Sequence, residues 1–310
     1  MISITRYRLI YYIVSGILVI GSIALLLMYG LKFGIDFTGG SLLEGRYQGG
    51  SVSKEQILEA IKKAGAEDAT FQQTSGDSFI LRFKNATNET SAGIQSELSK
   101  LGASKTPPYA FQELSFESIG PSVGSELKTN TVYAIALVLI LIASYVAYAF
   151  RKVSYPITSW KYGIVTLLTL FHDIVLPLGV FTILGHYRGI EVNVPFVAAI
   201  LTVMGYSVHD TIIVFDRIRE NLTKMRTASF NDVIDASLRQ TFIRSINTSL
   251  TVIFALVAIY IMGGEGVKYF ALALLVGIGA GTYSSIFVAS PLLLSWEQWT
   301  ERTKRKNSHK

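Results

Sequence analysis

The chain has 310 residues, of which 50% are hydrophobic and only 16% are charged, and it contains no cysteine. Soluble globular domains carry about 25% charged residues, and the mean hydropathy here is +0.41, so a membrane protein is the first class to consider. The absence of cysteine excludes disulfides, a thiol nucleophile and thiolate metal ligands. The net charge of +6 is spread in small groups between apolar runs, which argues against a nucleic-acid binder.

Six apolar stretches are long enough to cross a membrane, which takes about 20 residues. They cover residues 9–31, 129–150, 162–185, 192–215, 241–262 and 267–296. Arg6 and Arg8 precede the first stretch, as in a signal peptide, but its apolar run is longer than the roughly 7–15 residues of a signal sequence. We therefore expect it to remain as the first helix of a polytopic α-helical membrane protein.

The short loops differ strongly in charge from one side of the predicted spans to the other. Basic groups precede the first span, separate spans two from three and four from five, and follow the sixth. The opposite side has only Arg188 and Lys268 in its short loops. Because basic loops stay in the cytoplasm, both termini are expected there.

The segment 32–128 lies between the first two spans and is then extracytoplasmic. Its pattern alternates between strand and helix signals and predicts a small β-α-β-β-α-β unit of the ferredoxin-like type. The strands are expected at 41–47, 69–74, 78–84 and 111–120, and the helices at 52–65, with Ser53 as N-cap, and at 91–102. The predicted division of the chain is 1–31 (N-terminus and first helix), 32–128 (α+β domain), 129–300 (helices two to six) and 301–310 (basic cytoplasmic tail).

Ionisable residues inside the predicted spans are the strongest functional signal. They are the adjacent pairs His172-Asp173 in the third span and His209-Asp210 in the fourth, with Arg244 just inside the fifth. Each such group costs about 2.5–3.5 kcal/mol on insertion scales and usually faces the bundle interior or a water path.

Asp210 and Arg244 are expected to meet, because they lie at similar depth in two antiparallel helices joined by one loop. A carboxylate opposite an arginine inside a bundle can switch between a paired and a protonated state; a purely structural pair is the alternative. Asp173 lies near mid-bilayer and either belongs to the same pathway or makes a structural hydrogen bond. His209 either assists proton movement or is a packed neutral histidine.

No catalytic constellation, P-loop or metal-ligand cluster is present, so no enzyme activity, cofactor or metal site is expected. The glycine-rich stretch GIDFTGG at 34–40 leaves the first span without opening a helix. A tight hinge between the first helix and the α+β domain is the favoured interpretation, with Gly34, Asp36, Gly39 and Gly40 as its main residues.

Several stretches together resemble the SecF proteins of the SecD/SecF family of protein-export membrane components. They are FGIDFTGGSLLE, SIGPSVGSEL, FHDIVLPLG, GYSVHDTIIVFDRIREN and RQTFIRSINTSLT, in family order and across nearly the whole chain. One departure is His209, where the family commonly has asparagine.

The resemblance implies one six-helix half of a resistance-nodulation-division (RND) architecture in a bacterial-type plasma membrane. It implies a SecD partner, the SecYEG channel with SecA, a translocating unfolded polypeptide, and surrounding lipid. Asp210 would carry the proton, with Arg244 as its neighbour, although Na⁺ could replace H⁺ at a carboxylate. Two alternatives stay open: half of a proton-driven exporter of lipid or small molecules, and an inert scaffold.

Overall fold

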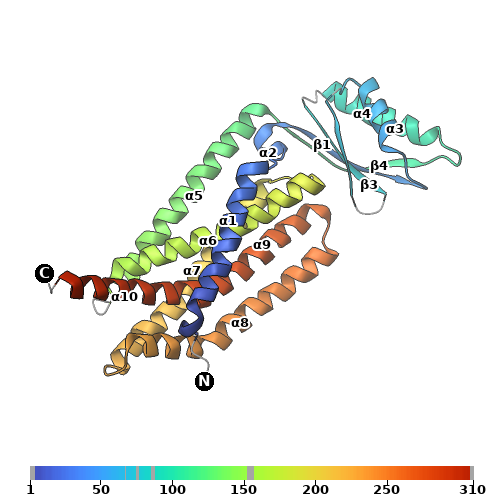
Figure 1. The fold of residues 1–310 in the computed structure, drawn as a ribbon. Helices are drawn as coiled ribbons and strands as arrows, with labels where there is room; N and C mark the ends of the chain where they lie inside the picture. The colour runs from blue at the N-terminus through green and yellow to red at the C-terminus, as the bar shows by residue number, and fades with distance from the viewer. Residues whose placement is uncertain (1–3, 67, 75–76, 85–87, 152–156, 308–310) are drawn as a thin grey trace. The chain divides into compact units, whose positions relative to one another are not determined.

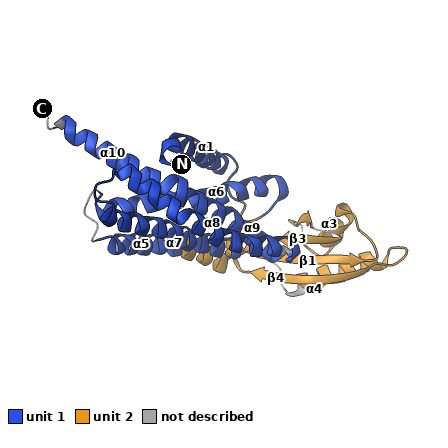
Figure 2. Ribbon diagram, turned by 90° about the horizontal axis from the view of Figure 1, so that it is seen from below, with its two compact units in different colours: residues 1–31, 133–190, 195–310 blue, residues 32–132, 191–194 orange. Residues whose placement is uncertain are grey.

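The computed structural model describes residues 4–66, 68–74, 77–84, 88–151 and 157–307. It is mostly helical with one four-stranded sheet, which confirms the predicted fold class. Figure 2 shows two compact units. The helical unit comprises residues 1–31, 133–190 and 195–310, and the sheet domain comprises residues 32–132 and 191–194.

Within the described residues, six helical segments are long and apolar enough to span a membrane. The segments are α1 (Arg8–Tyr29) after the short 3₁₀ turn η1 (Thr5–Tyr7), α5 (Pro121–Ala149), α6 (Ser159–Arg188), α7 (Val194–Lys224), α8 (Phe230–Met262), and a last one made of α9 (Glu265–Ser284), the π-helical turn η2 (Ser285–Ala289) and α10 (Ser290–Asn307) (Figure 1). Most of them run past the predicted apolar stretches because their polar ends remain helical. The predicted tail from 301 is the end of α10, and residues 308–310 lie outside the described residues.

The six segments are not equally buried in the helical unit. About half or more of the apolar core of α6, α7 and the last segment is buried, whereas little of α1, α5 and α8 is. Three buried aromatic rings pack together in this unit: Tyr162 stacks on Phe150 with ring centroids 5.0 Å apart and meets Phe215 edge-on at 5.1 Å. Because so little of α1, α5 and α8 is buried, these three helices expose apolar side chains on the surface of the unit.

The sheet domain has the predicted β-α-β-β-α-β order. Its elements are the short helix α2 (Ile35–Thr38), then β1 (Gly40–Gln48), α3 (Lys54–Lys63), β2 (Thr70–Gln73), β3 (Ser78–Phe83), α4 (Asn88–Ala103) and β4 (Ala110–Ile119). The strands lie in the order β2-β3-β1-β4 and every neighbouring pair is antiparallel. As predicted, α3 begins directly after Ser53.

The core of this domain follows from the period of two along its strands. Alternate residues of β3, Phe79, Leu81 and Phe83, are buried, because successive strand residues point to opposite faces. Ile61 of α3 and Leu98 of α4 are fully buried in the same cluster.

Candidate functional site

Asp210 lies near the middle of α7, roughly 20 Å from either helix end at 1.5 Å per residue. Its side chain is buried, and the residue is 5% exposed. Ser245 Oγ of α8 donates to Asp210 Oδ1 at 2.6 Å, and Ser285 Oγ of η2 donates to Oδ2. The carboxylate is thus held by hydroxyl groups from two other segments, which compensates part of its lost hydration.

Asp173 is a second carboxylate near the middle of its helix, and it is fully buried in α6. Ser284 Oγ donates to Asp173 Oδ2 at 2.8 Å, and Ser207 Oγ of α7 donates to the same oxygen. Asp173, like Asp210, is therefore held by hydroxyl groups from two other segments.

The two carboxylates are connected through consecutive residues. Ser284 is the last residue of α9 and contacts Asp173, while Ser285 is the first residue of the π-helical turn and contacts Asp210. π-helical turns are rare and frequently occur at functional sites. The turn coincides here with the point at which one helix serves both carboxylates.

The expected pairing of Asp210 with Arg244 is not what the structure shows. Arg244 is exposed, and none of the ion pairs among the described residues joins it to Asp210. The next residue, Ser245, occupies that position. The depth of Asp210 and Arg244 along their helices correctly predicts that α8 lies beside Asp210. The side chain that faces Asp210 differs, because consecutive residues of a helix point about 100° apart and Ser245 rather than Arg244 faces it.

The two histidines differ from each other. His172 Nδ1 lies 2.8 Å from Asp173 Oδ1, although the next position on a helix points about 100° away. His172 Nε2 is buried and has no hydrogen-bond partner among the described residues. His209 is exposed beside the buried Asp210, so the structure does not place it in the carboxylate cluster.

A second polar layer lies one turn away from Asp210. Ser249 Oγ of α8 and Thr282 Oγ1 of α9 are 2.5 Å apart, and the Tyr206 hydroxyl donates to Ser249 at 3.2 Å. Ser249 lies four residues after Ser245, and Tyr206 four residues before Asp210, so each lies one turn along its helix. Hydroxyl groups therefore continue from the Asp210 carboxylate for a further turn.

Close packing brings α9 against α7 at this cluster. A Cβ on Gly277 would lie 2.3 Å from Val203 Cγ2, and one on Gly281 would lie 3.0 Å from Ser207 Cβ. Small residues allow helices to approach each other closely, and these two glycines do so beside Ser207, which contacts Asp173.

The glycine-rich stretch forms a packed strap, which we define as residues 32–39 of the sheet domain. Gly34 N donates to Val192 O at 2.8 Å, and Val192 N donates to Lys32 O at 2.7 Å. Contrary to the expectation that this stretch opens no helix, it contains the four-residue helix α2. A hinge role for Gly34, Asp36, Gly39 and Gly40 stays a prediction.

Gly39 lies where the stretch FGIDFTGGSLLE packs against the stretch SIGPSVGSEL at the start of α5. Its φ is +72°, and a Cβ there would lie 2.8 Å from Pro121 Cα. A Cβ on Gly124 would in turn lie 2.9 Å from Gly39 N. The glycine-rich stretch and the start of α5 thus pack backbone against backbone, which requires glycine at both positions.

Asp36 in the strap caps a helix that begins far along the chain. Its Oδ2 accepts a hydrogen bond of 2.7 Å from Val194 N, the first residue of α7. A carboxylate at this position satisfies one of the free N–H groups and favours the positive end of the helix dipole. Asp36 and Val194 both belong to the sheet domain, so the first residue of α7 is held within that domain.

Replacing Asp36 by alanine is expected to loosen the first turn of α7, because a side chain that accepts from an N-terminal N–H group of a helix, as an N-cap does, contributes about 1 kcal/mol, or roughly fivefold in local opening. Hydrogen exchange of the amides of Val194, Phe196 and Val197, followed by mass spectrometry, measures this opening. Asp36→Asn keeps an acceptor and should exchange much like the original chain. Equal exchange in Asp36→Ala and the original chain would show that the cap does not stabilise α7.

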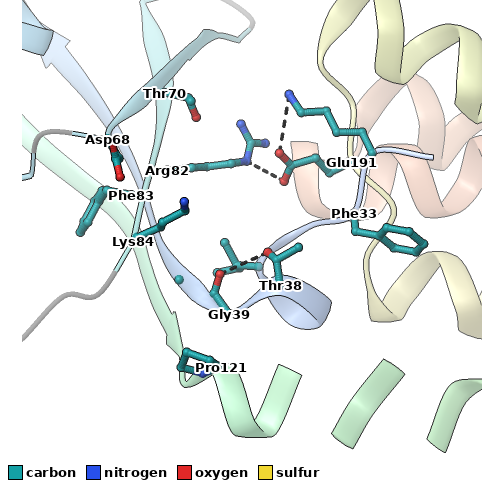
Figure 3. Close-up of a pocket in the computed structure, with 13 residues that line it drawn as sticks. Phe33, Thr38, Gly39, Asp68, Thr70, Arg82, Phe83, Lys84, Pro121 and Glu191 are labelled. Atoms are coloured by element: carbon teal, nitrogen blue, oxygen red, sulfur yellow. Dashed lines mark hydrogen bonds and ion pairs between the residues drawn. The ribbon is translucent and has the colours of Figure 1, made fainter. Parts of the chain in front are cut away.

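The strap also forms one wall of a cavity of about 490 Å³ inside the sheet domain (Figure 3). Arg82 Nε of β3 and Glu191 Oε2 form an ion pair of 2.7 Å across it, and Lys32 Nζ lies 3.8 Å from Glu191 Oε1. Burial raises the pKa of the Glu191 carboxyl, although Arg82 and Lys32 act to lower it. The ion pair ties the segment before α7 to the sheet.

Two serines of this cluster, Ser284 and Ser285, were not predicted from the sequence. The available signal was a Ser-Ser pair inside an otherwise apolar helix. Ser207 and Ser245 were visible as polar residues of the spans, but nothing distinguished them from serines that only join helices. In the part of the chain that the structure describes, no group of three or more His, Cys, Asp or Glu is arranged to hold a metal ion.

Two family profiles match this chain over the segments that contain the carboxylate cluster and the strap. The profile of the family "Protein export membrane protein SecD/SecF, C-terminal" matches residues 100–299, and that of the SecD/SecF GG motif matches residues 24–44. The latter stretch contains the strap.

Two curated relatives carry the name protein translocase subunit SecF. The one from Thermobaculum terrenum is 42% identical over 96% of this chain and 94% of its own length. The one from Haemophilus influenzae is 38% identical over 92% of this chain and 82% of its own length.

Among solved structures, the crystal structure of SecDF from Thermus thermophilus, described as a translocon-associated membrane protein, matches with a TM-score of 0.81 and 31% identity over 96% of this chain. A structure of SecDF in a super-membrane-facing form matches with a TM-score of 0.66 and 30% identity. This chain spans 39% of each of those SecDF chains. On these matches, the chain belongs to the SecF proteins of the SecD/SecF family of protein export membrane proteins.

Proposed function

We propose that this chain is the SecF subunit of a protein translocase and forms one half of a twelve-helix unit with SecD. The SecDF chains that it resembles are more than twice as long as the part it matches. The weakly buried helices α1, α5 and α8 offer apolar surface for lipid and for such a partner. His209 and Arg244 are exposed, and in this proposal they face the SecD half.

The proposed orientation places both termini in the cytoplasm and the α+β domain on the other side. The support is the distribution of basic residues, which favour cytoplasmic loops. The division of the chain at residues 31, 128 and 300 belongs to the same proposal. SecYEG, SecA and the emerging unfolded polypeptide are the proposed partners, and the subunit acts through binding and movement rather than through covalent catalysis.

The single observation that carries the mechanism is the pair of carboxylates joined by Ser284 and Ser285. Ser285 Oγ contacts the Asp210 carboxylate and also lies 3.0 Å from Thr282 O. Ser284 Oγ lies 2.8 Å from Asp173 Oδ2 and also 3.1 Å from Gly281 O. Each hydroxyl therefore has two acceptors for its one hydrogen.

This choice of acceptors suits a carboxyl group that gains and loses a proton. When Asp210 is charged, Ser285 donates to it; when Asp210 is protonated, its own O–H donates to Ser285 Oγ and the serine hydrogen turns to Thr282 O. Neither state leaves a buried polar group without a partner, which would cost about 1–3 kcal/mol. Asp173 and Ser284 can do the same, so the adjacent serines link two proton sites.

Removing one of these hydroxyls is expected to slow gradient-driven export about tenfold, at the lower end of what a charge-assisted hydrogen bond contributes. Ser285→Ala and Ser284→Ala should both show this loss in a protease-protection assay of a precursor, and Ser285→Thr should restore most of it. Ser290→Ala is a matched control, because Ser290 is buried nearby and its Oγ has no hydrogen-bond partner among the described residues. Full activity in Ser284→Ala and Ser285→Ala would remove the serine link from the mechanism.

The proposed function is tested by reconstituting the chain with SecD, SecYEG and SecA in proteoliposomes. The protease-protected fraction of a precursor should rise when the chain is included and a proton gradient is applied. A gradient effect that is the same with and without the chain would contradict the proposal. An exporter half would instead move lipid or a small molecule without any precursor.

A further inference from the structure

A second cavity lies at the end of the helical unit where the chain begins. It has a volume of about 370 Å³ and is lined by Thr5, Arg6, Arg8, Asn231 and Gln298. These residues come from η1, α1, α8 and α10, so three membrane-spanning segments meet around it. Neither of the two buried carboxylates, Asp173 and Asp210, lines this cavity.

The amide oxygens around this cavity lie within hydrogen-bond distance of donors from the same cavity. Arg8 Nη2 donates to Gln298 Oε1 at 2.8 Å, and Thr5 Oγ1 lies 2.8 Å from Asn231 Oδ1. The amide oxygen of Gln298 thus accepts from Arg8, that of Asn231 shares the Thr5 hydroxyl hydrogen with Asp235 Oδ2, and the amide N–H groups of both residues can act as donors.

The charges around the cavity favour an anion. Among the described residues, neither Arg6 nor Arg8 forms an ion pair with a carboxylate. The nearby Asp235 is 5% exposed; its Oδ1 accepts a hydrogen bond from Thr5 N, and its Oδ2 shares the single Thr5 hydroxyl hydrogen with Asn231 Oδ1. Two arginines and two amides thus present donors to the cavity, which matches the acceptor-only oxygens of a phosphate group.

The surroundings indicate that this phosphate belongs to a lipid. Directly after Arg8, the α1 side chains of Leu9, Ile10 and Ile13 are 68%, 56% and 53% exposed, and they provide an apolar surface for acyl chains. Trp299 of α10 is 66% exposed at the same end, where tryptophan is enriched at membrane–water interfaces. Basic pockets between membrane helices bind anionic lipid headgroups by the same chemistry.

We propose that the cavity lined by Thr5, Arg6, Arg8, Asn231 and Gln298 binds the phosphate of an anionic phospholipid. The lipid then joins α1 to α8 and α10 at this end of the unit. Its acyl chains lie along α1, next to Leu9 and Ile13.

Native mass spectrometry of the purified full chain, titrated with phosphatidylglycerol or phosphatidylcholine, tests the proposal. Phosphatidylglycerol should bind more tightly. Arg8→Gln should weaken its binding about fivefold and Arg6→Gln with Arg8→Gln about thirtyfold, from the contribution of each basic residue near a lipid surface. Arg226→Gln is the control, because Arg226 is an exposed arginine in the α7–α8 loop whose Nε donates to Thr223 O; this variant should bind the lipid like the original chain.

Three results would overturn the proposal. They are unchanged binding in the double variant, an equal loss in Arg226→Gln, and displacement of the lipid by an equal concentration of inorganic phosphate, which would make this a free-phosphate site. Arg6 is exposed and makes no hydrogen bond or ion pair among the described residues, so Arg6→Gln alone, with its fivefold loss, still tests the site if Arg8→Gln does not fold.

Discussion

An Asp210→Asn variant is expected to export precursor at the rate seen without a proton gradient. Asparagine has nearly the same shape as aspartate and still accepts the hydrogen bond from Ser245, but it cannot take up a proton. The structural consequence is therefore small and the functional consequence large. The measurement is protease protection of a precursor in inverted membrane vesicles, with and without the gradient.

Asp216→Asn is the matched control for this variant. Asp216 lies on the same helix, is exposed and pairs with Arg219 on the surface, so its loss should leave export unchanged. Normal gradient-dependent export by Asp210→Asn would refute the assignment of Asp210 as the proton carrier and leave the scaffold interpretation. Export that survives a protonophore and stops with a sodium ionophore would assign Na⁺ as the coupling ion.

A Glu297→Ala variant is expected to lose about 3–5 kcal/mol of folding stability, the usual effect of breaking a buried ion pair. Lys161 Nζ lies 3.2 Å from Glu297 Oε2, and both side chains are 8% exposed. Without the glutamate, the lysine keeps the hydrogen bond to Thr300 Oγ1 at 2.9 Å and the Trp296 ring, whose centroid lies 5.9 Å from Nζ, but no opposite charge among the described residues. Equilibrium unfolding of the purified chain in mixed detergent measures the loss.

The double variant Lys161→Met with Glu297→Leu distinguishes two causes of the stability loss: the missing ion-pair interaction and the burial of an unpaired lysine charge. It should recover most of the stability, because a buried pair can often be replaced by apolar residues of similar volume. If Glu297→Ala loses less than about 1 kcal/mol, the value of a surface pair, then Lys161 reaches water and the site is less buried than described.

The membrane spans and the sheet domain could be predicted because their signals are local. A run of about 20 apolar residues identifies a span without knowledge of its neighbours. The period of two in β3, with Phe79, Leu81 and Phe83 on one face, identifies a half-buried strand in the same way. These predictions are confirmed in type, and the differences are in the boundaries.

The carboxylate cluster could be predicted only in part. Asp173 and Asp210 were visible because charged residues are rare in apolar helices. Their partners depend on the rotation of each helix about its axis, which the sequence does not fix to one residue, so Arg244 was expected where Ser245 lies. The π-helical turn that presents Ser284 and Ser285 depends on tertiary packing and has no simple sequence signal.

The strap shows a second limit of local reasoning. Asp36 in a glycine-rich stretch is typical of a turn or hinge. Its partner, Val194 N, lies 158 residues away along the chain, and no local pattern connects the two. Only the fold shows that this stretch caps α7.

The π-helical turn at Ser285–Ala289 also determines how far α10 is rotated about the helix axis relative to α9. The serines that contact the carboxylates precede or begin the turn, and Glu297, which pairs with Lys161, follows it. Deleting one residue between 286 and 288 would allow an ordinary α-helix, but it would rotate everything beyond it by about 100° relative to the serines. The extra residue is therefore what lets a single helix serve the carboxylates and the buried ion pair at once.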